Sequence, residues 1–188
     1  MALQRVVNSF GAVAVATFTA VSRIEQIIHM PYQTLSSALS TFIGQNYGAK
    51  NIDRMRNGYK KSLYLMILFT IIMVSSMQFF GKPITALFVN DTPVIEMGAI
   101  ALRITSIFYF FLGIIYIMRG YLNGVGDSFF ALYNGIVEVI GRFTVPILFT
   151  SISFINVWGL WWSVGVVWFI SGATAFHRYL FYKKKHSL

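Results

Sequence analysis

The sequence predicts an all-α membrane protein, a polytopic bundle of about five transmembrane helices. Of its 188 residues, 56% are hydrophobic and only 11% are charged, and the mean hydropathy is +0.66. A chain of this length and composition has too little polar surface to cover a soluble domain. Runs of about 20 predominantly apolar residues, the length that crosses the hydrocarbon core of a bilayer, recur along the whole chain.

The proline residues help to place the helices within these runs. The first run exceeds what a bilayer needs at about 1.5 Å of rise per residue, so we expect it to tilt, to kink at Pro31 or to extend beyond the membrane. Pro146 should kink the fourth run, because its missing N–H frees a carbonyl one turn back. Pro93 should lie at a helix start, with Asp91 or Thr92 as the N-cap. The expected spans lie near residues 13–46, 62–80, 97–118, 129–150 and 158–179.

Basic residues orient the expected spans. They crowd residues 50–61 after the first span, position 119 after the third and residues 178–185 after the fifth. Because lysine and arginine accumulate in cytoplasmic loops, these ends are predicted to be cytoplasmic, and the C-terminus with them, in a multi-pass protein of the cell membrane. The formal net charge of +9 is therefore attributed to topology and not to nucleic-acid binding.

The start of the chain does not fit this topology. Five spans with a cytoplasmic C-terminus put the N-terminus outside, yet the first residues lack the charged region and apolar core of a signal peptide. A further helix upstream would repair the topology. We therefore expect residues 1–10 to be the end of a truncated helix and the chain to be part of a longer protein.

Polar and ionisable side chains form a stripe along the first expected span. Glu25 and His29 are one turn apart, so their side chains can touch, and Gln26 and Gln33 extend the stripe. Hydrocarbon tolerates ionisable groups only where they face protein or a water-filled cavity. We therefore predict that these four residues line a substrate or ion pathway. Burial disfavours the charged form of a carboxyl group, so Glu25 is the candidate for proton coupling or for pairing with a cationic substrate.

A structural role is the alternative for these charged groups. Glu25 can instead be half of a fixed ion pair with an arginine, and such a pair would lock helices together. Glu138 and Arg142 are i,i+4 neighbours with the acid on the N-terminal side, the favourable orientation, and a self-neutralising pair buries two charges at tolerable cost. Arg103, near the outer end of its helix, is a candidate for snorkelling to the interface. The possible arginine partners of Glu25 are Arg23, Arg103 and Arg142.

Several kinds of chemistry are not indicated. The chain has no cysteine and only three scattered histidines, so no metal site is expected. We find no nucleophile with an adjacent base and no cofactor fingerprint, and we predict that the protein is not an enzyme and needs no cofactor. Residues 124–127 contain a GxG pattern, but no strand precedes it, so a helix C-cap and a tight turn are expected there.

Several segments carry a family resemblance. Residues 7–11, 22–26, 30–31 and 38–50, together with Arg54, resemble the eighth helix and the following loop of the multidrug and toxic compound extrusion (MATE) transporters. Residues 119–127 resemble the loop after that family's tenth helix, and Glu138 with Arg142 resembles its eleventh.

This resemblance implies a twelve-helix exporter of two six-helix lobes. The chain would be the C-terminal lobe, residues 1–188, lacking most of its first helix, and its partners would be the lipid bilayer and the missing N-terminal lobe. Such proteins move organic cations or other small amphipathic, drug-like compounds outward in exchange for Na⁺ or H⁺. A lobe alone is expected to be inactive.

The chain departs from the family pattern at its ion-binding acids. Some members carry an acid in the seventh helix, which is absent here, and an aspartate in the tenth, where Leu112 stands; others place the acid in the N-terminal lobe. Two other functions therefore stay open. One is a non-transporting membrane remnant of a truncated gene. The other is half of a lipid-linked sugar flippase of the same superfamily, which needs several arginines lining its cavity to bind pyrophosphate.

Overall fold

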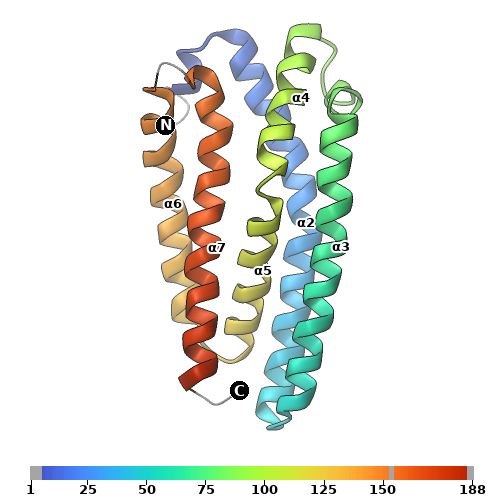
Figure 1. Cartoon of the computed structure of the whole chain (residues 1–188), viewed down its shortest axis with the longest axis vertical. Helices are drawn as coiled ribbons and strands as arrows, with labels where there is room; N and C mark the ends of the chain where they lie inside the picture. Colours follow the sequence, from blue (N-terminus) through green and yellow to red (C-terminus); the bar gives the residue numbers. More distant parts are fainter. Residues whose placement is uncertain (1–5, 153–154, 186–188) are drawn as a thin grey trace.

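The computed structural model, which describes residues 6–152 and 155–185, is a bundle of long helices (Figure 1). Helix α5 lies centrally and packs against α2, α3, α6 and α7, while α3 also packs on α4 and α6 on α7. The turn between α2 and α3 and the end of α7 lie at the same end of the bundle. The predicted all-α class is confirmed. The elements are α2 (Ala12–Gly48), α3 (Ile52–Ala86), α4 (Thr92–Ser106), α5 (Tyr109–Gly124), α6 (Ser128–Thr150), the short 3₁₀ helix η1 (Asn156–Trp158) and α7 (Gly159–Lys185).

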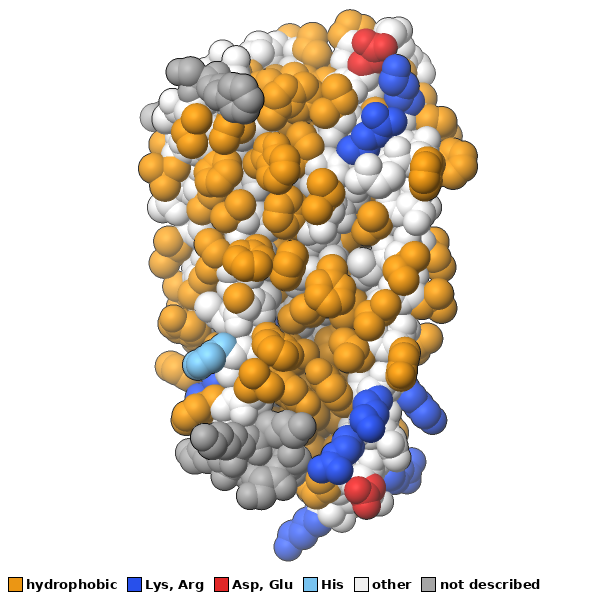
Figure 2. Space-filling view, in the orientation of Figure 1, with side chains coloured by type: hydrophobic (Ala, Val, Ile, Leu, Met, Phe, Trp, Pro, Cys, Tyr) orange, Lys and Arg blue, Asp and Glu red, His pale blue; other side chains and the backbone are white. Residues whose placement is uncertain are grey.

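Exposed apolar side chains cover the middle of the bundle, as expected of a surface that faces lipid (Figure 2). Within the part of the chain that the structure describes, three stretches are long and apolar enough to cross a membrane alone, namely Ile52–Ala86, Leu132–Thr150 and Asn156–Tyr182, and α4 with α5 passes the same test as one bent pair. Helix α2, although 37 residues long, is not among them. Its polar stripe lowers the hydropathy of the central segment, which fits a helix that faces a cavity as well as lipid.

The third expected span, residues 97–118, is two helices in the structure. Helices α4 and α5 meet at a bend of 52°. The side-chain amide of Gln78 donates hydrogen bonds of 3.0 Å to the Arg103 carbonyl and to the Ser106 hydroxyl. The Ser106 hydroxyl itself donates to the Arg103 carbonyl. Both side chains donate to the carbonyl oxygen of Arg103, which in a continuous helix would accept from a backbone N–H one turn later, and α4 ends there.

Proline residues lie inside helices α2, α3 and α6. Helix α3 runs past its expected end at residue 80 and kinks at Phe80, where φ is −114° and ψ is 20°. Pro83 follows, and its missing N–H leaves the carbonyl of Phe79 without its helical partner. Pro31 and Pro146 lie inside α2 and α6, and both helices continue through them.

Two predicted helix ends are confirmed. Helix α4 begins with Asp91 in the N-cap position and Pro93 in its first turn. Helix α5 ends at Gly124, and Gly126 adopts a φ of 88°, the left-handed conformation that glycine accepts without strain. The N–H of Asp127 then donates to a carbonyl in the last turn of α5, at 2.8 Å.

Glycines let α5 pack closely on α2. A Cβ atom added to Gly120 would lie 2.6 Å from the carbonyl oxygen of Ser36, and one added to Gly124 would lie 2.7 Å from that of Ser40. The Ser36 hydroxyl donates across the same contact to the carbonyl of Tyr116, at 2.7 Å. Small residues at such contacts are typical of membrane helices, where close backbone approach drives association.

Replacing Gly120 with alanine should therefore destabilise the bundle. The added methyl group meets backbone atoms that cannot rotate away, and overpacking of this kind costs about 1–3 kcal/mol. The measurement is thermal unfolding of the purified chain in detergent. Gly135→Ala in α6 is the matched control, because nothing lies within 4 Å of its added Cβ. Equal melting of both variants would contradict the close contact between α2 and α5.

Candidate functional site

A cavity of about 250 Å³ lies between α2, α6 and α7. Helix α2 contributes Ser22, Glu25, Gln26 and His29, whose spacing of three or four residues puts them on one helix face. Helix α6 adds Arg142. Helix α7 closes the cavity with an apolar wall that includes Trp161, Val164, Val167 and Trp168.

Buried polar atoms without hydrogen-bond partners surround this cavity. Among the described residues these atoms include Oε1 of Glu25, Nε2 of His29 and the indole Nε1 atoms of Trp161 and Trp168. Leaving one such group unpaired costs about 1–3 kcal/mol, so buried polar groups in proteins are nearly always bonded to protein or to ordered water. One acceptor and two obligate donors at a single cavity therefore indicate a site for a polar ligand, an ion or water.

Aromatic residues hold His29 in place. Its ring centroid lies 6.1 Å from that of Tyr116 and 5.5 Å from that of Trp168. The Tyr116 hydroxyl lies 3.5 Å from Nδ1 of His29 and accepts a hydrogen bond of 3.3 Å from the amide of Gln33. Gln33 thus reaches His29 through Tyr116 and does not itself line the cavity.

Glu25 has no arginine partner in the structure. Within residues 6–152 and 155–185, no ion pair joins it to Arg23, Arg103 or Arg142. Arg23 and Arg103 are exposed, and Nε of Arg103 donates to the carbonyl of Gln78 at 3.1 Å. Arg142 does line the cavity, but its guanidinium is bound to Glu138. The fixed ion pair considered for Glu25 is therefore not formed here.

Glu138 is held by two arginines. Its Oε1 lies 2.6 Å from Nη2 of Arg142, the i,i+4 pair expected from the spacing, and its Oε2 lies 2.8 Å from Nη2 of Arg119. Arg119 also donates to Asn134, whose amide donates to the carbonyl of Ser171. This network joins α5, α6 and α7 and keeps Arg142 at the edge of the cavity.

The structure brings some of the predicted site residues together and leaves others apart. Glu25, Gln26, His29 and Arg142 meet at the cavity, whereas Arg23 and Arg103 lie outside it. Sequence reasoning missed several residues, because each acts on a residue of another helix and no short sequence spacing marks such a contact. The missed residues are Tyr116, Arg119, Asn134, Trp161 and Trp168.

In the described ranges no three histidine, cysteine, aspartate or glutamate side chains form a metal site.

Comparison with known sequences connects this arrangement to transporters. Residues 1–150 match the sequence profile of the family described as MatE. The chain is 25% identical over 180 residues to the probable multidrug resistance protein YpnP of Bacillus subtilis, a match that covers 95% of this chain and 40% of YpnP. It is 33% identical over 110 residues to the FAD transporter of Shewanella oneidensis, a match that covers 58% of this chain and 24% of that protein.

Solved structures share the fold. A mutant form of the Vibrio cholerae MATE transporter VcmN superposes with a TM-score of 0.88 at 23% identity, over 97% of this chain and 42% of that one. The inward-facing conformation of a MATE family transporter of the MOP superfamily superposes with a TM-score of 0.84 at 16% identity, over 92% and 40%. At these identities the likeness establishes the fold alone. The chain thus spans less than half the length of the relatives it matches.

Proposed function

The chain belongs to the MATE family, and from that premise we propose that it is the C-terminal part of a multidrug exporter that exchanges small cationic or amphipathic compounds for Na⁺ or H⁺. The observation that carries this proposal is a cavity inside an apolar helix bundle that has the ionisable residues Glu25 and His29 on one wall. Ionisable groups at membrane depth mark ion and substrate pathways. The relatives named as multidrug resistance and multidrug export proteins support the same class of activity.

The exposed face of α2 supports a two-part transporter. Arg23, Gln26, Gln33, Ser37 and Thr41 recur along this helix and are all exposed. A polar stripe of this length is costly against lipid but favourable against a water-filled passage between two lobes. We propose that a second lobe faces this stripe and that the substrate passes between the two.

Glu25 is the proposed coupling group within the cavity. Because Arg142 is bound to Glu138, no ion pair joins the Glu25 carboxyl to a cation in the described chain. The carboxyl is therefore available to take up and release a proton, or to bind a cation directly. His29, held by Tyr116 and Trp168, presents its free Nε2 to the same space.

Efflux of a fluorescent organic cation tests the proposal. We expect no efflux from cells that produce this chain alone, and ion-gradient-dependent efflux when it is joined to the segment of a relative such as YpnP that precedes the part this chain matches. Absence of efflux from a joined protein that reaches the membrane and folds would favour a non-transporting remnant. A flippase for lipid-linked sugars is less well supported, because of the three membrane arginines considered for it only Arg142 lines the cavity.

Charge asymmetry gives the proposed orientation. Lysine and arginine side chains gather at the end of the bundle where α2 meets α3 (Figure 2). Lys82, in the last turns of α3 toward the opposite end, lies 3.2 Å from Glu96. By the positive-inside rule, the α2–α3 turn and the end of α7 are then cytoplasmic.

Single cysteines in this cysteine-free chain should report that orientation. A membrane-impermeant thiol reagent applied to intact cells should label Leu87→Cys, after α3, and should label Ala49→Cys only after the cells are permeabilised. Both positions are exposed, so access depends on the side of the membrane. Labelling of Ala49→Cys in intact cells would reverse the proposed orientation.

A further inference from the structure

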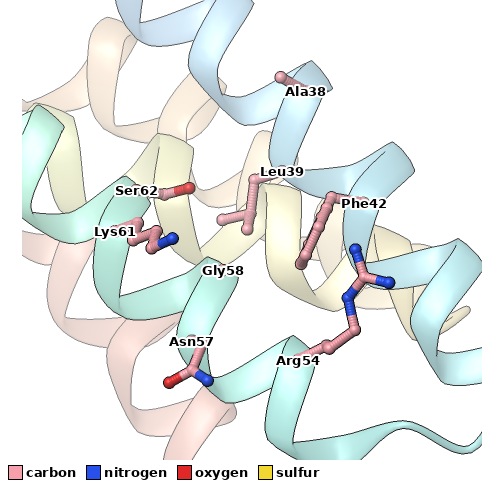
Figure 3. Close-up of a pocket in the computed structure, with 8 residues that line it drawn as sticks. All are labelled: Ala38, Leu39, Phe42, Arg54, Asn57, Gly58, Lys61 and Ser62. Carbon is pink, nitrogen blue, oxygen red and sulfur yellow. The ribbon is translucent and has the colours of Figure 1, made fainter.

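A second pocket, a groove of about 500 Å³, lies between α2 and α3 at the basic end of the bundle (Figure 3). Its apolar base comes from Leu39 and Phe42 of α2 and from Gly58 of α3, and its polar rim includes Arg54 and Lys61 of α3. The groove shares no lining residue with the cavity at Glu25. Its chemistry is therefore separate from that of the proposed transport site.

The rim of the groove is cationic. Arg54 and Lys61 are seven residues apart, so they lie two turns apart on the same face of α3. The guanidinium carbon of Arg54 lies 5.8 Å from the centroid of the Phe42 ring, which fixes one cation over the base of the groove. Neither Arg54 nor Lys61 forms an ion pair with another residue that the structure describes, and no carboxylate lines the groove.

The base of the groove is closely packed. A Cβ atom on Gly58 would overlap the ring of Phe42, so glycine at this position lets the aromatic ring pack closely against α3. Phe42 in turn packs beside the guanidinium of Arg54 (Figure 3). The position of the arginine is thus set by packing between two helices and not by a flexible loop.

An exposed apolar stripe continues from the groove along α3. Leu65, Leu68 and Ile72 occupy the same helix face as Arg54 and Lys61, and their side chains are 56%, 57% and 49% exposed. Helix α3 is itself one of the membrane-length apolar helices. Two cations therefore lie at one end of a surface that suits hydrocarbon chains, and a ligand with an anionic head and an apolar tail fits both parts.

We propose that this groove binds an anionic phospholipid from the leaflet at the basic end of the bundle. Its phosphate lies between the Arg54 guanidinium and the Lys61 ammonium, and its acyl chains lie along Leu65, Leu68 and Ile72. Arginine and lysine both bind phosphate oxygens through charge-assisted hydrogen bonds. Basic pockets between membrane helices are suited to anionic lipid head groups. A free phosphate would use the cations but would leave the apolar stripe unused.

Native mass spectrometry of the full chain in detergent tests the proposal. The probes are phosphatidylglycerol and phosphatidylcholine with identical acyl chains, and we expect about tenfold tighter binding of phosphatidylglycerol. The double variant Arg54→Gln with Lys61→Gln should lose this preference. The control Lys50→Gln with Arg56→Gln removes the same charge from the same region without touching the groove, and it should keep the preference. Arg54→Lys with Lys61→Arg should also keep most of it, since both cations remain.

Three results would overturn the proposal. One is equal binding of the two lipids by the unmodified chain. Another is full retention of the preference in a folded Arg54→Gln, Lys61→Gln double variant, with helicity checked by circular dichroism. The third is displacement of phosphatidylglycerol by inorganic phosphate at the same concentration, which would show that the groove selects the free anion.

Discussion

Replacing Glu138 with glutamine should lower the free energy of unfolding by about 3 kcal/mol, because the change leaves the Arg119 guanidinium without its carboxylate inside the bundle and removes the partner of the more exposed Arg142. The Glu138 side chain is 17% exposed and that of Arg119 is 21% exposed, so water replaces little of the lost interaction. Glutamine keeps the shape and can still accept a hydrogen bond, but it cancels neither positive charge. Losing the carboxylate should cost less free energy at Arg142 than at Arg119, because solvent reaches the more exposed Arg142.

Thermal unfolding in a mild detergent measures this effect. Glu96→Gln is the matched control, because Glu96 also pairs with a cation, Lys82, but both side chains are largely exposed, at 60% and 59%. Loss of such a surface pair costs at most about 1 kcal/mol. Combining Glu138→Gln with Arg119→Gln should restore part of the stability by removing one stranded charge. If Glu138→Gln and Glu96→Gln melt alike, the Glu138 network does not hold the helices together.

Replacing Glu25 with glutamine should abolish ion-coupled efflux in the completed transporter while leaving folding intact. Amide and carboxyl groups are nearly isosteric, but only the acid exchanges a proton or neutralises a bound cation. In the described chain Glu25 has no arginine partner that the substitution would strand. We therefore expect stability to change by less than about 1 kcal/mol. The measurement is efflux of a fluorescent organic cation, with membrane level and melting temperature determined on the same protein.

The control for this substitution is again Glu96→Gln, the same chemical change outside the cavity, which should leave efflux unchanged. Wild-type efflux from a stably expressed Glu25→Gln protein would eliminate Glu25 as the coupling group. A loss of stability comparable to that of Glu138→Gln would indicate that Glu25 is instead half of an ion pair in another conformation.

Local patterns in the sequence predict much of the fold. The apolar runs, the start of α4 at Asp91 and Pro93, and the turn at Gly126 follow from residue types and short spacings. The pairing of Glu138 with Arg142 follows in the same way, because both lie on one helix face. The polar stripe of α2 likewise places Glu25 and His29 beside each other, and both line one cavity.

Contacts between helices are not predictable from these patterns. Arg119 stands at the end of an apolar run, where the pattern indicates a cytoplasmic charge, yet it reaches Glu138 on the next helix. The position of Trp161 near the end of its run is typical of the membrane interface, but the fold places its indole, with that of Trp168, at the cavity. The break between α4 and α5 carries no glycine or proline, because its cause is a side chain, Gln78, on another helix.

Helix α2 is unbroken from Ala12 to Gly48, and it carries both Glu25 on the cavity wall and Phe42 on the wall of the groove. The helical rise between these two side chains is about 25 Å. A continuous helix moves as one unit, so a tilt of α2 that accompanies ion binding at the cavity would also open or narrow the groove. Any such coupling is reciprocal, and occupancy of the groove would then alter the affinity of the cavity by the same factor.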